Sequence, residues 1–181
     1  GLAALHLALS EPERVRALVL ANSAGLDRAV SPFLANLALP RGTEPMAAWH
    51  RTPPGATHRA FVRASLLFAR PWQIPLKWVT GQYRLSRLAN FARTELATLR
   101  TSINPGGQRE VFVDRLPHLQ MPTLVVWGTE DRVFPVWQGT GAAARLANGS
   151  LELVPNCGHL PHVEKPERFV SILGEFVGGS R

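Results

Sequence analysis

The sequence has little cysteine and no long apolar run. Its single cysteine, Cys157, leaves no partner for an internal disulfide, which fits the cytoplasmic location that we expect. No run approaches the roughly 18 consecutive apolar residues of a membrane-spanning helix, and the chain does not open on a basic segment followed by an apolar stretch. The sequence therefore predicts neither a disulfide-stapled domain nor a membrane span.

Acidic residues are scarce in one part of the chain. Over the 181 residues, 20 Lys and Arg stand against 13 Asp and Glu, but from Arg28 to Arg115 the numbers are 13 and 4. These basic residues stand singly among apolar ones, without zinc-ligand spacing or an aromatic RNA-binding motif, so we interpret them as a solvated helical surface and expect no nucleic-acid partner. No His, Asp and Glu cluster has ligand spacing either, so we expect no metal and no cofactor.

Two strand ends carry the most chemistry. The apolar run Thr123 to Trp127 is typical of a strand buried on both faces, and it leads through a glycine turn to Asp131. A helical segment from about 136 to 146 follows, and then a second strand, 151–154, whose following turn holds His159. Because a strand, a helix and a parallel strand form a right-handed crossover, both turns should lie at the carboxyl edge of one sheet.

The first residues add a third strand to this unit. Helix formers occupy residues 1–9, and the run Arg14 to Leu20 is typical of a buried strand. A last helix should open near Glu164 and end before Gly178. We therefore predict an α/β fold with a parallel sheet of about three strands, in which the run from Arg14 forms an apolar edge.

Between residues 26 and 119 the pattern changes to short helical stretches separated by Pro and Gly. We predict two parts: a core formed by residues 1–25 and 120–181, and a helical lid formed by residues 26–119. The apolar residues expected inside the lid, some of them lining a pocket, are Phe61, Leu66, Leu67, Phe68, Trp72, Ile74, Trp78 and Phe91. The charged residues expected on its outside are Arg59, Arg63, Arg70, Arg84 and Arg87.

Three motifs resemble the carboxyl-terminal part of an α/β-hydrolase-fold enzyme. They are P-T-L-V-V-W-G-T-E-D at 122–131, C-G-H-L-P-H-V-E-K-P-E-R-F at 157–169 and the opening G-L-A-A-L-H-L-A-L-S-E-P-E-R-V-R-A-L-V-L. In that family a nucleophile in a G-x-S-x-G turn precedes an acid and then a histidine. The resemblance implies that Asp131 is the acid and His159 the histidine, and that the nucleophile lies just upstream of Gly1.

The chemistry explains the residue types. A serine hydroxyl becomes a good nucleophile when an imidazole takes its proton, and a carboxylate orients that imidazole. The resemblance thus implies a hydrolase of an ester, a thioester or a related carbonyl compound, with a small apolar or acyl substrate. A carbon–carbon bond hydrolase, a dehalogenase or an epoxide hydrolase would share the acid and the histidine, and the last two would use an Asp nucleophile.

Several alternatives remain open from the residues alone. Asp131 could be a turn residue and His159 a buried structural histidine, with His162 in its place as the base. Ser23, after a strand, or Cys157 could replace the missing nucleophile. The 181 residues could also be a catalytically inactive fragment or a non-catalytic binding module, and we expect the chain alone to be catalytically incomplete.

Overall fold

The centre of the molecule is a three-stranded parallel sheet. A computed structural model describes residues 1–39 and 41–179. The strands are β1 (Leu18–Ala21), β4 (Thr123–Gly128) and β5 (Gly149–Val154), in the order β1-β4-β5. Leu18 lies opposite Thr123, and Thr123 lies opposite Gly149. The prediction of an α/β fold with three parallel strands is confirmed, and β1 is an edge of the sheet in the part of the chain that the structure describes.

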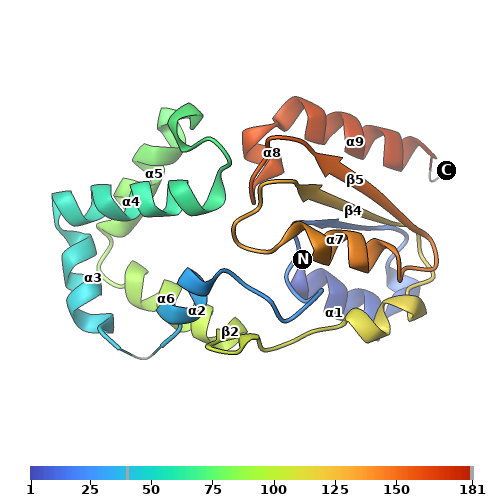
Figure 1. The fold of residues 1–181 in the computed structure, drawn as a ribbon, viewed down its shortest axis with the longest axis horizontal. Coiled ribbons are helices and arrows are strands. Elements are labelled where there is room, and N and C mark those ends of the chain that lie inside the picture. Colours follow the sequence, from blue (N-terminus) through green and yellow to red (C-terminus); the bar gives the residue numbers. More distant parts are fainter. Residues whose placement is uncertain (40, 180–181) are drawn as a thin grey trace.

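Both faces of β4 are covered, which explains its unbroken apolar sequence. Val125 and Trp127 face a core shared with the helices α1 (Leu2–Ser10) and α7 (Val136–Ala143). Leu124 and Val126 point the other way, toward α9 (Pro166–Gly179). Figure 1 shows α7 and α9 on opposite sides of the sheet. Successive residues of a strand alternate between faces, so only a strand covered on both sides is apolar at every position.

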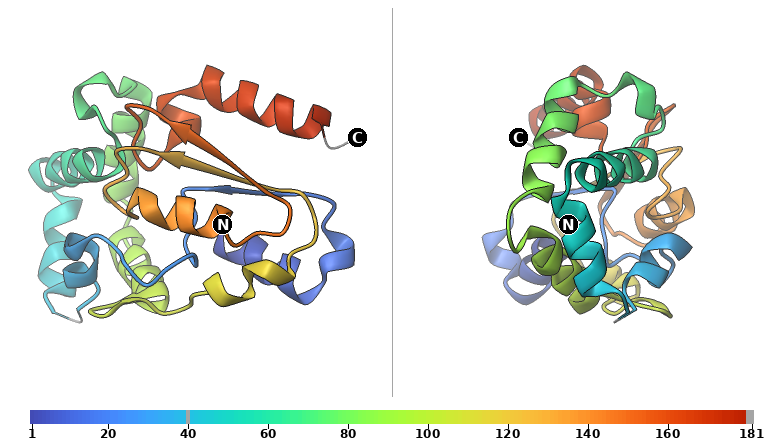
Figure 2. Two further views of the ribbon diagram at one scale, coloured as in Figure 1. Left: turned by 45° about the vertical axis from the view of Figure 1, so that its right-hand side comes forward. Right: turned by 90° about the vertical axis from the view of Figure 1, so that its left-hand side faces the viewer.

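A group of helices lies to one side of this core, at the left of Figure 1. They are α2 (Pro32–Leu37), α3 (Thr43–Arg51), α4 (Pro53–Leu67), α5 (Leu76–Ser86) and α6 (Phe91–Ser102), with the 3-10 turn η2 (Pro71–Gln73) between α4 and α5. Figure 2 shows the same helices from two further directions. We call this group the lid, and its separation from the core at residues 26 and 119 remains a prediction.

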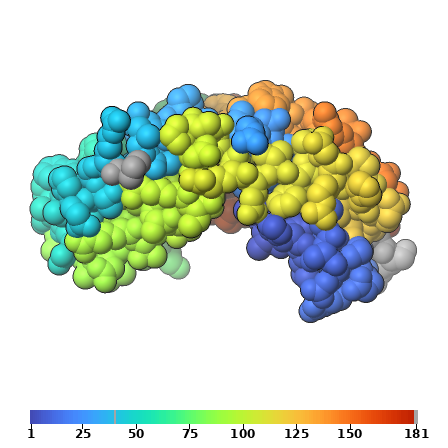
Figure 3. Space-filling model, turned by 90° about the horizontal axis from the view of Figure 1, so that it is seen from below, coloured from blue at the N-terminus to red at the C-terminus, as the bar shows by residue number. Residues whose placement is uncertain are grey.

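The chain returns from the lid along one face of the molecule. A short hairpin of β2 (Ile103–Asn104) and β3 (Gly107–Gln108) is followed by the 3-10 segment η3 (Val113–His118). Figure 3 shows this stretch, in yellow, crossing between the lid and α1. The remaining short elements are η1 (Pro12–Arg14) and α8 (Pro161–Glu164).

Several predicted elements have different bounds in the structure: β5 begins at Gly149 instead of Leu151, and the last helix continues to Gly179 instead of ending before Gly178. The first strand begins at Leu18 instead of Arg14, because η1 occupies residues 12–14 and the first bond to the neighbouring strand runs from Leu18 N to Pro122 O. The helix α7 ends at Ala143, three residues early, before the turn into β5. The last helix begins at Pro166, since Pro161–Glu164 forms a separate short helix.

The predicted inside and outside of the lid are wrong at three positions. Phe61 and Trp72 are 67% and 74% exposed, whereas Arg59 is only 4% exposed. The buried face of α4 includes Ala56, Ala60 and Ala64. Phe61 lies about 100° around the helix from Ala60 and so points away from that face. Arg59 instead faces α6, where it finds a carboxylate partner.

Candidate active site

The structure brings Asp131 and His159 together. Asp131 follows the end of β4 and His159 follows the end of β5, and parallel pairing places both turns at one edge of the sheet. His159 Nδ1 lies 3.0 Å from Asp131 Oδ2. The two residues predicted from their separate strand ends are therefore hydrogen-bonded neighbours.

The Asp131 carboxylate is fully buried and held on all sides. Its Oδ1 accepts hydrogen bonds from the backbone N–H groups of Val133 and Phe134, at 2.7 and 3.2 Å. Its Oδ2 accepts one from Asn22 Nδ2 at 2.6 Å, in addition to the contact with His159. Donors on both oxygens offset the cost of burying this carboxylate.

The contact with Asp131 determines which nitrogen of His159 carries its proton. A carboxylate accepts hydrogen bonds, so in the neutral ring Nδ1 is the donor and Nε2 is the basic nitrogen. The side chain is 19% exposed, and Phe134 packs edge-on against the ring with centroids 5.4 Å apart. Nε2 of His159 is thus able to accept a proton, and the charge that results would be stabilised by Asp131.

The backbone around His159 is anchored to neighbouring helices. His159 N donates to Leu67 O at the end of α4 at 2.8 Å, and Gly158 N donates to the Glu164 carboxylate in α8 at 2.7 Å. A Cβ at Gly158 would lie 2.6 Å from Leu67 O, closer than any real contact. The close approach of the loop to α4 explains why a glycine precedes the histidine.

Sequence reasoning missed Asn22, which follows β1. Its side chain is buried, and it joins two strand ends: Nδ2 donates to Asp131 and Oδ1 accepts from Gly128 N at 3.3 Å. The backbone adopts φ +44°, a left-handed conformation that asparagine tolerates better than most residues. The sequence did contain a signal for this role: Asn22 directly follows a buried strand, at the same sheet edge as Asp131.

The three alternative site residues lie in other environments. The buried Ser23 hydroxyl donates to Ala24 O at 2.9 Å. Cys157 is fully buried, and burial together with the nearby Glu164 carboxylate raises the pKa of its thiol to about 12, so the nucleophilic thiolate is disfavoured. His162 is exposed on α8, with its ring beside Phe169. These observations favour His159 as the base.

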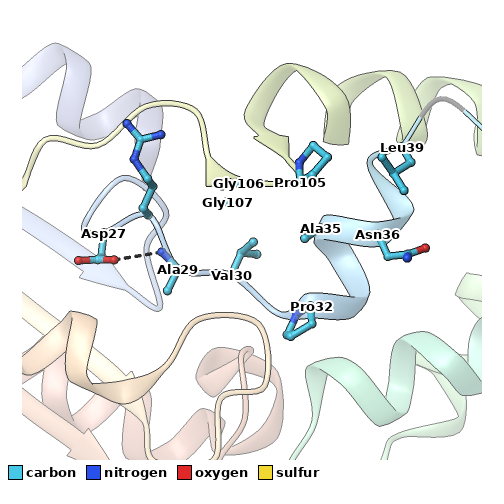
Figure 4. A pocket seen from close by; sticks show the side chains of 11 residues that line it. Asp27, Ala29, Val30, Pro32, Ala35, Asn36, Leu39, Pro105, Gly106 and Gly107 are labelled. Atoms are coloured by element: carbon cyan, nitrogen blue, oxygen red, sulfur yellow. Dashed lines mark hydrogen bonds between the residues drawn. The ribbon is translucent and has the colours of Figure 1, made fainter.

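Two hollows lie on the lid side of the molecule. The first, a cavity of about 780 Å³, lies among α2, α3, α4 and α6. The second, about 650 Å³ and open to solvent, lies between residues 27–39 and the turn at 105–107 (Figure 4). In the second hollow the Asp27 side chain accepts a hydrogen bond from Ala29 N, and the polar side chains of Arg28 and Asn36 also line the wall.

Residues 1–39 and 41–179 hold neither a metal-binding cluster nor a membrane-spanning helix. Those residues contain no group of three or more His, Cys, Asp or Glu side chains able to hold a metal ion. None of their helices combines the length and the apolar composition that crossing a bilayer requires.

Comparison with known proteins gives relatives over nearly the whole chain. A 2-hydroxymuconate semialdehyde hydrolase of Pseudomonas sp. (strain CF600) is 30% identical over 196 residues, covering 96% of this chain and 57% of that protein. The crystal structure of a bacterial membrane phospholipase A has a TM-score of 0.71 at 27% identity, covering 98% of this chain and 54% of the other. The chain therefore spans little more than half the length of these relatives.

A further solved structure has the same fold at lower identity. The 2-hydroxy-6-oxo-6-phenylhexa-2,4-dienoate hydrolase from Rhodococcus sp. strain RHA1 gives a TM-score of 0.72 at 20% identity, covering 96% of this chain and 59% of the other. The model of the "Alpha/beta hydrolase family" matches residues 1–172. With that match over almost its entire length, the chain belongs to the alpha/beta hydrolase family.

Proposed function

We propose that the protein containing this chain is a hydrolase that attacks a carbonyl carbon through a serine, histidine and aspartate triad. His159 is the general base and Asp131 is the acid that orients it. The nucleophilic serine belongs to a segment outside these 181 residues, and the lid covers a small apolar or acyl substrate. The observation that carries the proposal is the buried Asp131 carboxylate on Nδ1 of His159, which leaves Nε2 as the basic nitrogen.

The geometry supports the following steps. His159 Nε2 takes the proton of the serine hydroxyl as the serine oxygen bonds to the substrate carbonyl carbon. The imidazolium that forms is stabilised by Asp131 and then gives its proton to the leaving group. Water completes the cycle, again with His159 as the base, and releases the acid product. Four hydrogen-bond donors surround the Asp131 carboxylate and hold it in place beside the imidazolium.

Two kinds of substrate bond are candidates for cleavage. An ester or thioester follows from the triad alone. A carbon–carbon bond next to a carbonyl group is favoured by the relative at 30% identity, which is named for 2-hydroxymuconate semialdehyde. The acid and histidine serve both reactions, so the choice depends on the substrate that the lid admits.

The test uses the whole protein, p-nitrophenyl butyrate and 2-hydroxymuconate semialdehyde. His159→Ala should lower kcat by about 10⁶-fold on whichever substrate is turned over, and Asp131→Asn by about 10⁴-fold. His162→Ala is the matched control, since His162 is an exposed histidine three residues away, and it should keep its activity. Equal activity of the wild type and His159→Ala would refute the proposal.

The 181-residue chain alone gives a second check. We expect it to hydrolyse p-nitrophenyl butyrate no faster than its own His159→Ala variant. Turnover by this chain that depends on His159 would mean that Ser23 is the nucleophile. A whole protein that is folded but turns over neither substrate would favour a binding module instead.

A further inference from the structure

The lid encloses a cavity with a largely apolar wall. It measures about 780 Å³, within the range of about 300 to 1,000 Å³ typical of small-molecule sites. The helices α2, α4 and α6, at the left of Figure 1, contribute most of the wall. Apolar residues that line it include Phe33, Leu34, Val62, Leu66, Leu96 and Leu99. A cavity of this size and composition suits an apolar chain of several carbons.

Three charged side chains interrupt this apolar wall. Arg59 and Arg63 come from α4 and Glu95 comes from α6. Arg59 is buried and fully engaged: Nη2 donates to Glu95 Oε2 at 2.6 Å, Nη1 donates to Ser86 Oγ at 3.0 Å, and its guanidinium lies 4.8 Å from the Phe91 ring centroid. One carboxylate oxygen of Glu95 is therefore already used by Arg59.

Arg63 is less completely paired. Its Nη1 donates to the other oxygen of Glu95. Its Nε is buried and has no hydrogen-bond partner among the described residues. That atom is closed to solvent and therefore to a ligand, but the Arg63 side chain as a whole is 36% exposed, and an acceptor brought by a ligand can meet its exposed part.

The wall also carries an excess of positive charge. Two arginines share the single carboxylate of Glu95. The pKa of His50, which also lines the cavity, is lowered by burial and by the nearby Arg59, so this ring is neutral at pH 7 and adds no charge. Burial likewise lowers the pKa of Arg63, the mark of a cation that is only partly compensated. An anion at Arg63 would supply the missing compensation.

We propose that the lid cavity is a binding site for a small amphipathic anion, with its apolar chain between α2, α4 and α6 and its carboxylate at Arg63. This inference does not depend on the proposed function, because neither Asp131 nor His159 is among the described residues that line the cavity. The cavity nevertheless lies close in space to His159, although the two are far apart in the chain. Leu66 lines the cavity, and the carbonyl of the next residue, Leu67, accepts the hydrogen bond of His159 N.

The test compares two ligands that share a ten-carbon chain and differ in the head group, one an anion and the other neutral. Decanoate and 1-decanol have the same chain, and their binding is measured by calorimetry at about pH 7.5, below the concentration at which either aggregates. We expect decanoate to bind about tenfold more tightly or better, because a hydrogen bond between charged groups is stronger than one to a neutral hydroxyl. This comparison uses the unaltered protein, so it does not depend on the folding of any variant.

Variants locate the site. Arg63→Gln should weaken decanoate binding about tenfold and leave 1-decanol unchanged. Arg87→Gln removes the same charge from an exposed position of the lid outside the cavity and should change neither affinity. Val62→Trp should weaken both ligands by filling the cavity.

Three results would overturn the inference. They are equal affinities for the two ligands, no binding of either, and unchanged decanoate binding by a folded Arg63→Gln variant. His159→Ala should bind decanoate as the wild type does. That variant separates the two proposals, because it abolishes the proposed catalysis without touching the cavity.

Discussion

A change of one atom in Asn22 tests how the candidate acid is held. Asn22→Asp keeps the shape of the side chain and tolerates the left-handed backbone at φ +44°. It keeps the oxygen that accepts from Gly128 N. It replaces the amide nitrogen, 2.6 Å from Asp131 Oδ2, by a second carboxylate oxygen. An attractive contact between a donor and an acceptor thus becomes a contact between two like charges.

The expected loss of stability is large at neutral pH. Asn22 is only 3% exposed and the side chain of Asp131 is fully buried, so water screens the pair poorly. Two unit charges about 4 Å apart repel by roughly 4 kcal/mol at an effective dielectric constant of about 20. The lost hydrogen bond adds to this figure. Since whole domains are stable by roughly 5 to 15 kcal/mol, the variant should be close to unfolding.

The loss should shrink in acid. One proton shared between the two carboxyl groups restores an O–H donor, and the folded variant therefore binds a proton that the unfolded chain has released. The free energy of unfolding should accordingly be recovered as the pH falls, and be lost again as the pH rises and the shared proton leaves.

The assay is urea unfolding followed by tryptophan fluorescence, at about pH 5 and about pH 7.5. Asn104→Asp is the matched control, because the Asn104 Oδ1 accepts from Gly106 N and a carboxylate can keep that bond. Its effect should stay within about 0.5 kcal/mol. Equal stabilities of the two variants at the higher pH would refute the reasoning, and so would a loss in Asn22→Asp that does not depend on pH.

Two further predictions concern other buried groups. Because burial raises the pKa of the Cys157 thiol to about 12, a disulfide reagent at about pH 8 should label this thiol only after the protein is unfolded in guanidinium chloride. The protonated thiol contributes to the stability of the folded state, and that contribution should be lost as the pH rises through about 12. Glu95→Gln leaves the buried Arg59 without its carboxylate, so it should lower the free energy of unfolding by about 3 kcal/mol in a urea titration. Glu44→Gln is the control: it breaks a solvent-exposed pair with Arg93 and should leave the free energy of unfolding nearly unchanged.

The lid was the part of the fold least accessible to prediction. Its helices are visible as apolar stretches between prolines, but which face of each helix is buried depends on the neighbouring helix. Arg59 was expected outside and lies inside, because Glu95 of α6 lies across from it. Phe61 was expected inside and is exposed, since it lies to the side of the face that α4 buries. Local sequence does not record such pairings.

The candidate site was predictable where it depends on strand order. An apolar run followed by an acid, a helix, and a second strand followed by a histidine were enough to predict that Asp131 and His159 share one sheet edge. The parallel crossover has a single preferred handedness, so the sequence order of the two strands determines the edge at which both turns lie. That juxtaposition is what the structure shows, at 3.0 Å.

The sequence by itself determined the class of fold, the three parallel strands and the two side chains on which the proposed chemistry depends. These features arise from local apolar patterns and from chain order, both of which can be read along one dimension. Only the tertiary structure decided that Asn22 holds the acid, that His159 presents Nε2, and that Arg63 borders an apolar cavity. Each of these depends on residues that are far apart in the chain, and only the packing of strands and helices brings such residues into contact.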